Sequence, residues 1–246
     1  MTDIALITGA NKGIGFETAR QLAEQGWTVL VGSRDQSRGE EAAAVLRANG
    51  LQATAIELDV SNDHSIIEAA KRIAETFDHL DVLVNNAGIY APSTPSGTSR
   101  ALLRDIFETN VFGTVAVTNA FLPLLRRSKR ARIVNVSSEI ASFTLITDPD
   151  SYLFGMHDMA YQTSKAAVNM ITTMYAKELL VEGIKVNAAI PGYVSTDLND
   201  YTGQISAAEG AAASVGLALV PEDGPTGTFW GTLTSSPNGD MAVAPW

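Results

Sequence analysis

Hydrophobic residues occur along this chain in short continuous runs, and segments with a helical period separate them. The runs predict strands at 4–8, 28–33, 53–59, 81–85, 132–137 and 185–190. The segments between them predict helices near 13–25, 36–48, 62–77, 99–127 and 159–182. Short apolar strands that alternate with helices are typical of a parallel sheet covered on both faces. We therefore predict a doubly wound α/β fold of about seven strands, in a single domain that spans 1–246.

The chain changes character after the last of these strands. A turn-rich stretch follows Pro191, and a helix is predicted from about Ser206, because Ser206 and Glu209 have the spacing of a capping box. The remaining tail is rich in glycine and proline and ends at Trp246.

Composition and charge narrow the classes of function. The net charge of -10 argues against nucleic-acid binding by bulk electrostatics. The chain has no cysteine, which excludes disulfides and favours a reducing compartment. The first residues, MTDIALITGA, lack the basic region of a signal peptide, and no run reaches the roughly 18 apolar residues of a membrane span. We expect a cytoplasmic protein with neither a nucleic-acid nor a membrane partner.

The first predicted turn is the first indication of a ligand. In ITGANKGIG, Gly9, Gly13 and Gly15 join the first strand to the first helix. Glycines let the backbone turn tightly and let a pyrophosphate approach the N–H groups at the start of the helix. The spacing differs from the usual fingerprint, but its position after the first strand of an alternating chain predicts a Rossmann-type dinucleotide site.

The end of the second strand indicates which dinucleotide binds. Asp35 lies where the usual count from the glycine turn favours NAD. Ser33, Arg34 and Arg38 are clustered at the same strand end, however, and Lys12 lies in the glycine turn. Guanidinium groups pair well with phosphate, so we predict NADPH, with Asp35 acting as a helix N-cap. The alternative is that the two arginines form a solvated helix face.

Further motifs occur in the order of one known family: TGANKGIG, LDV at 58–60, NNAG at 85–88, Asn110 in FETNVFG, VNVSS at 134–138, YQTSK at 161–165 and PGYVSTD at 191–197. In these motifs the chain resembles the short-chain dehydrogenase/reductases over nearly its whole length, and it is most similar to their NADPH-dependent carbonyl reductase branch. The resemblance implies four catalytic residues, which are Asn110, Ser138, Tyr161 and Lys165. Together with the glycine turn and the arginine pair, it implies a cofactor site made of Gly9, Asn11, Lys12, Gly13, Ile14, Gly15, Ser33, Arg34, Arg38, Asp59, Val60, Asn86, Ala87, Gly88, Tyr161, Lys165, Pro191, Gly192, Val194 and Thr196.

Tyr161 and Lys165 have a spacing that suits proton transfer. Residues four apart share a helix face, and a nearby ammonium favours the phenolate, so we expect the pKa of Tyr161 to be lowered. Tyr161 is then expected to protonate a carbonyl oxygen as hydride arrives, while Ser138 hydrogen-bonds the same oxygen. The resemblance also implies that Lys165 holds the nicotinamide ribose and that Asn110 anchors a relay water.

Each of these residues has a structural alternative. Ser137 is the alternative to Ser138, and the alternative for Asn110 is a hydrogen bond to the backbone of a neighbouring strand. Tyr161 and Lys165 are also compatible with an amphipathic core residue and a snorkelling surface residue.

The gap from Ser138 to Tyr161 is 23 residues, which is longer than is commonest in the family. We interpret 139–160 as an insert near the substrate pocket, and 191–220 as a loop and helix on the substrate side. Residues of these segments are expected to line the pocket, namely Tyr152, Phe154, Met156, His157 and Tyr193. The alternative is a self-packed surface loop. For the oligomeric state, the sequence is compatible with a dimer, a tetramer or a monomer.

These observations predict an NADPH-dependent oxidoreductase that reduces a ketone or aldehyde to an alcohol, with a small carbonyl or alcohol compound as its partner and no metal. The alternative among enzymes is an NAD-linked secondary alcohol dehydrogenase. The alternative from another class is a non-catalytic dinucleotide-binding sensor, which the presence of all four catalytic residue types disfavours.

Overall fold

The computed structural model describes residues 3–234 and 241–246. One sheet runs through this part of the chain. Its strands are Ile4–Ile7 (β1), Thr28–Ser33 (β2), Ala53–Glu57 (β3), Val82–Asn85 (β4), Arg132–Val136 (β5), Lys185–Ile190 (β6), Phe229–Thr232 (β7) and Met241–Val243 (β8). The spatial order is β3-β2-β1-β4-β5-β6-β7-β8, and every pairing up to β7 is parallel. This is the predicted doubly wound α/β fold.

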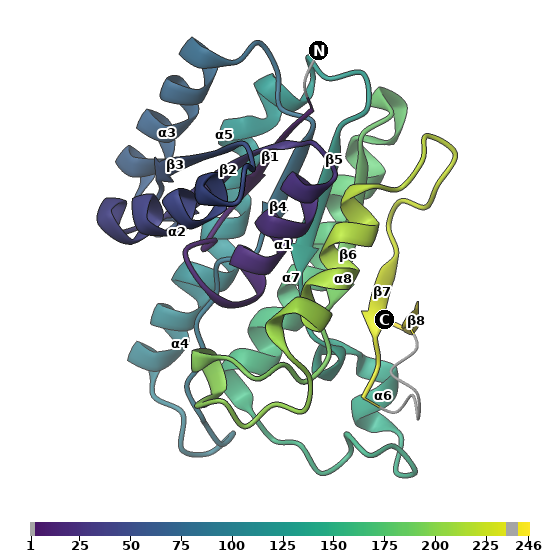
Figure 1. The fold of residues 1–246 in the computed structure, drawn as a ribbon. Coiled ribbons are helices and arrows are strands. Elements are labelled where there is room, and N and C mark those ends of the chain that lie inside the picture. Colours follow the sequence, from purple (N-terminus) through teal and green to yellow (C-terminus); the bar gives the residue numbers. More distant parts are fainter. Residues whose placement is uncertain (1–2, 235–240) are drawn as a thin grey trace.

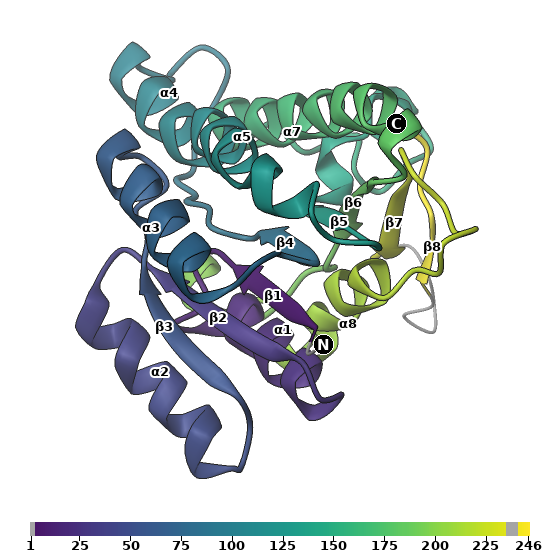
Figure 2. The same cartoon turned by 90° about the horizontal axis from the view of Figure 1, so that it is seen from above.

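Helices cover both faces of the sheet, as Figure 2 shows. Helices α1 (Gly13–Glu24), α2 (Gln36–Ala48) and α8 (Ala207–Ala218) lie on one face, and α3 (Asp63–Thr76), α5 (Gly113–Leu125) and α7 (Met159–Glu178) lie on the other. Each face has its own apolar core between sheet and helices. Every residue of β1, β4 and β5 is buried, which explains why these strands are continuous apolar runs in the sequence.

The short helices gather at the carboxyl ends of the strands. These are α4 (Arg100–Phe107) and α6 (Phe143–Thr147), which lie toward the lower end of Figure 1. Single turns of 3-10 helix occupy Glu139–Ala141, Leu180–Glu182 and Asp197–Asn199. The sheet order reverses at β1, with β2 on one side and β4 on the other. In open α/β sheets, ligands bind at the carboxyl ends of the strands at such a reversal.

The described sheet has eight strands, whereas the sequence located six and predicted about seven in all; β7 and β8 are the two that it did not locate. Strand β8 pairs antiparallel with β7 through Trp230 and Val243. It has only three residues, all of them exposed, at the edge of the sheet. A run this short has no apolar pattern to reveal it.

The helix predicted over 99–127 is interrupted. A π-helical turn, Glu108–Phe112, separates α4 from α5 and contains Asn110. Next to it Gly113 packs closely, since a Cβ there would lie 2.7 Å from the carbonyl oxygen of Val60. Apolar periodicity does not distinguish one extra residue within a turn from a regular helix, so this feature was not predicted. No helix in the part of the chain described has both the length and the apolar character to cross a membrane.

Candidate active site

The glycine turn between β1 and α1 is locked to the loop that follows β4. Asn86 Nδ2 donates to the carbonyl oxygen of Thr8 at 2.9 Å. The backbone N–H groups of Asn86 and Ala87 both donate to Thr8 Oγ1, at 3.0 and 2.9 Å. Gly9 has φ +62°, and a Cβ on Gly15 would lie only 2.4 Å from Asn86 Nδ2. Glycine is therefore required at this contact, and two loops predicted to bind one cofactor meet here.

The loop after β6 faces the same turn. Gly13 has φ +58°, and a Cβ on it would lie 3.6 Å from Thr196 Cγ2. Lys12 forms an ion pair with Asp197, the residue after Thr196. Asn11 and Ile14 are partly exposed on the turn. The chain thus brings segments 9–15 and 191–197 together at the carboxyl edge of the sheet.

Not every predicted residue of the loop after β6 is directed at the turn. Val194 is buried, and its Cγ2 lies 2.4 Å from the place of a Cβ on Gly210, so its side chain packs against α8. Pro191 is also buried, while Gly192 adopts φ +84°. In this loop the Thr196 side chain lies beside the glycine turn, whereas the Val194 side chain is directed at α8.

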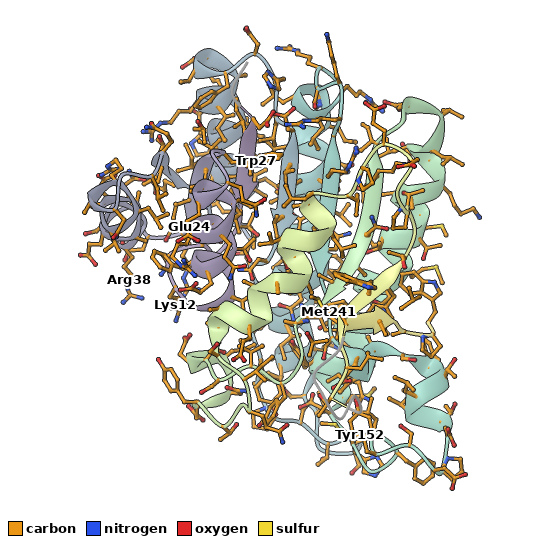
Figure 3. All side chains as sticks on the ribbon, turned by 45° about the vertical axis from the view of Figure 1, so that its right-hand side comes forward. Lys12, Glu24, Trp27, Arg38, Tyr152 and Met241 are labelled. Atoms are coloured by element: carbon orange, nitrogen blue, oxygen red, sulfur yellow. The ribbon has the colours of Figure 1, made fainter. Side chains whose placement is uncertain are left out.

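The end of β2 carries the predicted cations. Asp35 caps α2, because its Oδ1 accepts from the backbone N–H of Arg38 at 3.1 Å, which confirms the predicted N-cap. Arg38 Nε lies 3.6 Å from Asp35 Oδ2. The Ser33 hydroxyl is buried and donates to the carbonyl oxygen of Asp35 at 2.8 Å. Arg34 is exposed and has no ion pair within residues 3–234 and 241–246. Figure 3 shows Lys12 and Arg38 projecting from the same flank of the molecule.

Asp59 and Val60 follow β3 and complete this flank. Asp59 Oδ1 accepts from the backbone N–H of Ser61 at 3.0 Å and from its hydroxyl at 2.7 Å. Val60 is buried against Gly113 at the start of α5. Asp59 is thus held in a local turn while its residue remains partly exposed.

Tyr161 and Lys165 lie in the first half of α7, with their side chains together. Lys165 Nζ is 5.5 Å from the centroid of the Tyr161 ring, and it donates to the carbonyl oxygen of Val136 at 2.7 Å. Lys165 is only 5% exposed, and this burial lowers the pKa of its ammonium to about 8. A Cβ on Gly88 would lie 3.7 Å from Lys165 Nζ. The lysine therefore joins α7 to the ends of β4 and β5.

The pKa of Tyr161 differs from the sequence-based expectation. Burial of the phenol raises this pKa, and the Asp158 carboxylate and Tyr90 raise it further. We expected the Lys165 ammonium to lower the pKa of Tyr161. That ammonium donates its hydrogen bond to the Val136 carbonyl oxygen instead, and burial lowers its own pKa. In the protein alone, Tyr161 is thus held in its protonated form, which is the form a proton donor needs.

The two serines after β5 have different surroundings. Ser137 is buried, and its hydroxyl donates to Asn169 Oδ1 at 2.6 Å and to the carbonyl oxygen of Lys165 at 3.4 Å. Ser138 is partly exposed, and its hydroxyl has no hydrogen-bond partner in the described chain. Ser137 thus belongs to the scaffold, and Ser138 is the serine whose hydroxyl is available to a ligand.

Asn110 holds two parts of the site together. Its Oδ1 accepts from the backbone N–H of Ile89 at 2.8 Å, and its Nδ2 donates to the Ile89 carbonyl oxygen and to Ser164 Oγ, both at 3.0 Å. Ser164 Oγ in turn donates to the carbonyl oxygen of Tyr161 at 2.7 Å. The side chain thus binds backbone groups, but those of the loop after β4 rather than those of a strand.

Two residues that the sequence did not single out contact Tyr161. The ring of Tyr90 meets that of Tyr161 edge to face, with centroids 5.3 Å apart. Asp158 caps α7, because its Oδ1 accepts from the backbone N–H of Tyr161 at 3.1 Å and from Ser93 Oγ at 3.1 Å. An aspartate directly before a helical pattern is a capping signal that was available in the sequence. Tyr90 offered no such signal, because it lies on a distant segment.

The insert 139–160 is partly exposed and tied to the C-terminal part of the chain. Tyr152, Phe154 and Met156 are exposed, and Figure 3 shows Tyr152 at the lower end of the molecule. The carboxylate of Glu139 accepts hydrogen bonds from the Tyr152 hydroxyl and from the backbone N–H of Thr234, the latter at 2.9 Å. Among residues 3–234 and 241–246, no three His, Asp or Glu side chains are grouped as a metal would require.

The sheet order, the glycine turn and the ends of β4, β5 and β6 define a Rossmann-type oxidoreductase. A model of the short chain dehydrogenase family matches residues 3–205. The chain is 41% identical over 241 residues to the short-chain dehydrogenase anuI of Penicillium roqueforti, covering 96% of this chain and 94% of that protein. The chain therefore belongs to the short-chain dehydrogenase family, whose members are oxidoreductases that bind a nicotinamide dinucleotide.

Solved structures agree with this assignment. Salutaridine reductase from Papaver somniferum is similar with a TM-score of 0.79 and 30% identity, covering 92% of this chain and 99% of that one. NADPH-bound carbonyl reductase from chicken fatty liver is similar with a TM-score of 0.81 and 26% identity, covering 93% of this chain and 95% of that one.

Proposed function

We infer that the protein reduces a ketone or aldehyde to an alcohol with NADPH, with Tyr161 as the proton donor. The observation that carries this inference is the grouping of a protonated Tyr161, the available Ser138 hydroxyl and the buried Lys165 at the ends of β4 and β5. The names of the relatives support it, since they include a salutaridine reductase and an NADPH-bound carbonyl reductase.

The candidate cofactor site has the chemistry that NADPH requires. Gly9 and Gly15 leave the turn without a side chain where it meets the loop after β4, and Lys12, Arg34 and Arg38 supply positive charge on one flank. When bound, the cofactor supplies the hydride. Arg34 and Arg38 would hold its ribose phosphate. Lys12 would leave Asp197 and pair with the same phosphate.

The residues of the chain then divide the work on the substrate. Ser138 donates a hydrogen bond to the substrate oxygen while negative charge develops there. Tyr161 gives its phenolic proton to that oxygen. Lys165 contributes positive charge beside the Tyr161 ring, and Asn110 keeps α7 in place through Ser164.

A Tyr161→Phe variant tests the proton donor. The change removes only the hydroxyl, so the fold and NADPH binding should persist while kcat falls at least about 100-fold, the usual contribution of general acid catalysis. The measurement is NADPH oxidation against a broad panel of ketones and aldehydes, with NADPH affinity followed by fluorescence. A fully active variant would overturn the mechanism, and no turnover of any carbonyl by the wild type with either cofactor would favour the non-catalytic sensor.

An Arg34→Ala variant tests the choice of cofactor. The lost charge-assisted hydrogen bonds should weaken NADPH by about tenfold or more and leave NADH nearly unchanged. Arg72→Ala, on helix α3, is the control because it removes an equal charge from an exposed site away from β2. Equal weakening of both cofactors, or a wild type that prefers NADH, would replace this proposal by the NAD-linked dehydrogenase.

A further inference from the structure

Three segments follow the carboxyl ends of β4, β5 and β6, near Tyr161 and Ser138, and we call them the substrate-side segments: 89–99, 139–158 and 191–206. The first and second are joined by the hydrogen bond from Ser93 Oγ to Asp158 Oδ1 at 3.1 Å. Burial and the Asp158 carboxylate raise the pKa of Tyr90, and Tyr193 adds to this, so the third segment also lies beside Tyr90. Tyr90 in turn contacts Tyr161.

These segments expose apolar and aromatic side chains. Tyr90, Tyr152, Phe154, Met156, Tyr193 and Leu198 are each between 38% and 48% exposed. Large apolar side chains at the carboxyl end of such a sheet are suited to cover the body of a ligand. Among them, Tyr193 is held in place by its hydroxyl, which lies 2.6 Å from Thr202 Oγ1.

The same segments contain no lysine and no arginine, while they contain six acidic residues: Glu139, Asp148, Asp150, Asp158, Asp197 and Asp200. The absence extends through the C-terminal part of the sequence, where no lysine or arginine follows Lys185. The basic residues that border the segments are engaged elsewhere or lie on a neighbouring helix. Lys12 pairs with Asp197, Lys165 is bound to Val136, and Arg100 begins helix α4.

An anionic substrate would be disfavoured by these surroundings. Its charged group would lose water against apolar side chains and find no lysine or arginine among the substrate-side segments. Proteins normally compensate such a desolvation by pairing the charge. The acidic residues other than Asp197, which pairs with Lys12, would add repulsion. An uncharged apolar body meets neither cost and gains from burial.

We propose that the substrate is a carbonyl compound with an apolar body and no negative charge, and that the enzyme discriminates against keto acids and other anionic carbonyls. The inference rests on the proposed reductase function and names the substrate class of the same site. It follows from the exposed apolar side chains and the missing cations of the three segments.

The test compares matched substrates that differ in charge or in apolar size. One set is cyclohexanone, cyclohexanone bearing a propyl group, and the same ring bearing propanoate; a second pair is para-methylbenzaldehyde and para-formylbenzoate. We expect kcat/KM to rise by up to about fourfold for each methylene that becomes buried. We expect the carboxylate compounds to be poorer than their neutral partners by at least about tenfold.

A variant that adds a positive charge at Tyr90 tests whether the lack of lysine and arginine causes the lower kcat/KM of the carboxylate substrates. In Tyr90→Lys, the ratio of kcat/KM for the carboxylate to that for the neutral partner should rise about tenfold relative to Tyr90→Met, which removes the same ring without adding charge. Equal kcat/KM for both partners in the wild type overturns this inference and leaves the reductase function intact. If the wild type reduces none of these carbonyl compounds with either cofactor, the reductase function is overturned instead.

Discussion

Lys165 and Tyr161 lie side by side, and burial favours the uncharged form of both side chains. Burial lowers the pKa of Lys165 to about 8 and raises that of Tyr161. The sequence indicated the pair correctly, because four-residue spacing fixes a shared helix face. The expected lowering of the Tyr161 pKa was wrong, because burial of the phenol and its contact with Tyr90 depend on segments that are remote in the sequence.

The lowered pKa of Lys165 predicts a pH dependence. Its positive charge is present below about pH 8 and is lost as the pH rises through that value. We therefore expect kcat/KM for NADPH, which reports the free enzyme, to fall above about pH 8. Lys165→Arg keeps its charge throughout this range, so the inflection should be absent from its residual activity. The same inflection in both proteins would assign it to another group.

At the scale of elements, the contact between the glycine turn and the loop after β4 orders the candidate cofactor site. The strand–turn–helix unit was predictable from its glycines and from the apolar run before them. Its attachment was not, because the Asn86–Thr8 hydrogen bonds join loops that only the β1–β4 pairing brings together. The same holds for the Lys12–Asp197 pair, which joins residues 185 positions apart.

Gly15→Ala tests this attachment. The new Cβ would lie 2.4 Å from Asn86 Nδ2 and 2.6 Å from the Gly9 carbonyl oxygen, so the turn must shift. We expect the free energy of unfolding to drop by about 1–3 kcal/mol, as for other overpacked sites, together with a clear loss of NADPH affinity. Gly155→Ala is the control, since a Cβ there meets nothing within 4 Å. Urea unfolding and cofactor titration measure both effects, and wild-type behaviour of Gly15→Ala would refute the contact.

At the scale of the molecule, the predicted fold is correct because strands buried on both faces must be apolar throughout. The site residues in the loops after β4, β5 and β6 were predictable as strand-end residues, since parallel strands bring their carboxyl ends to one edge. Asn110, Tyr161 and Lys165 lie on helical segments instead and were predicted from the family resemblance. What the pattern missed lies outside such strands. Strand β8 is exposed and short, and Tyr90 acts on Tyr161 only through tertiary packing.

The π turn at Glu108–Phe112 has a consequence for how the length of this chain can vary. Each residue of an α-helix advances about 100° around its axis, so deleting one residue there would regularise the helix and rotate everything upstream by about that angle. Either Ile106 would leave the core or Asn110 would leave Ile89. The length of this segment is therefore fixed to the single residue, whereas Gly155 lies in an exposed loop outside any helix, where an added residue does not change a helical phase.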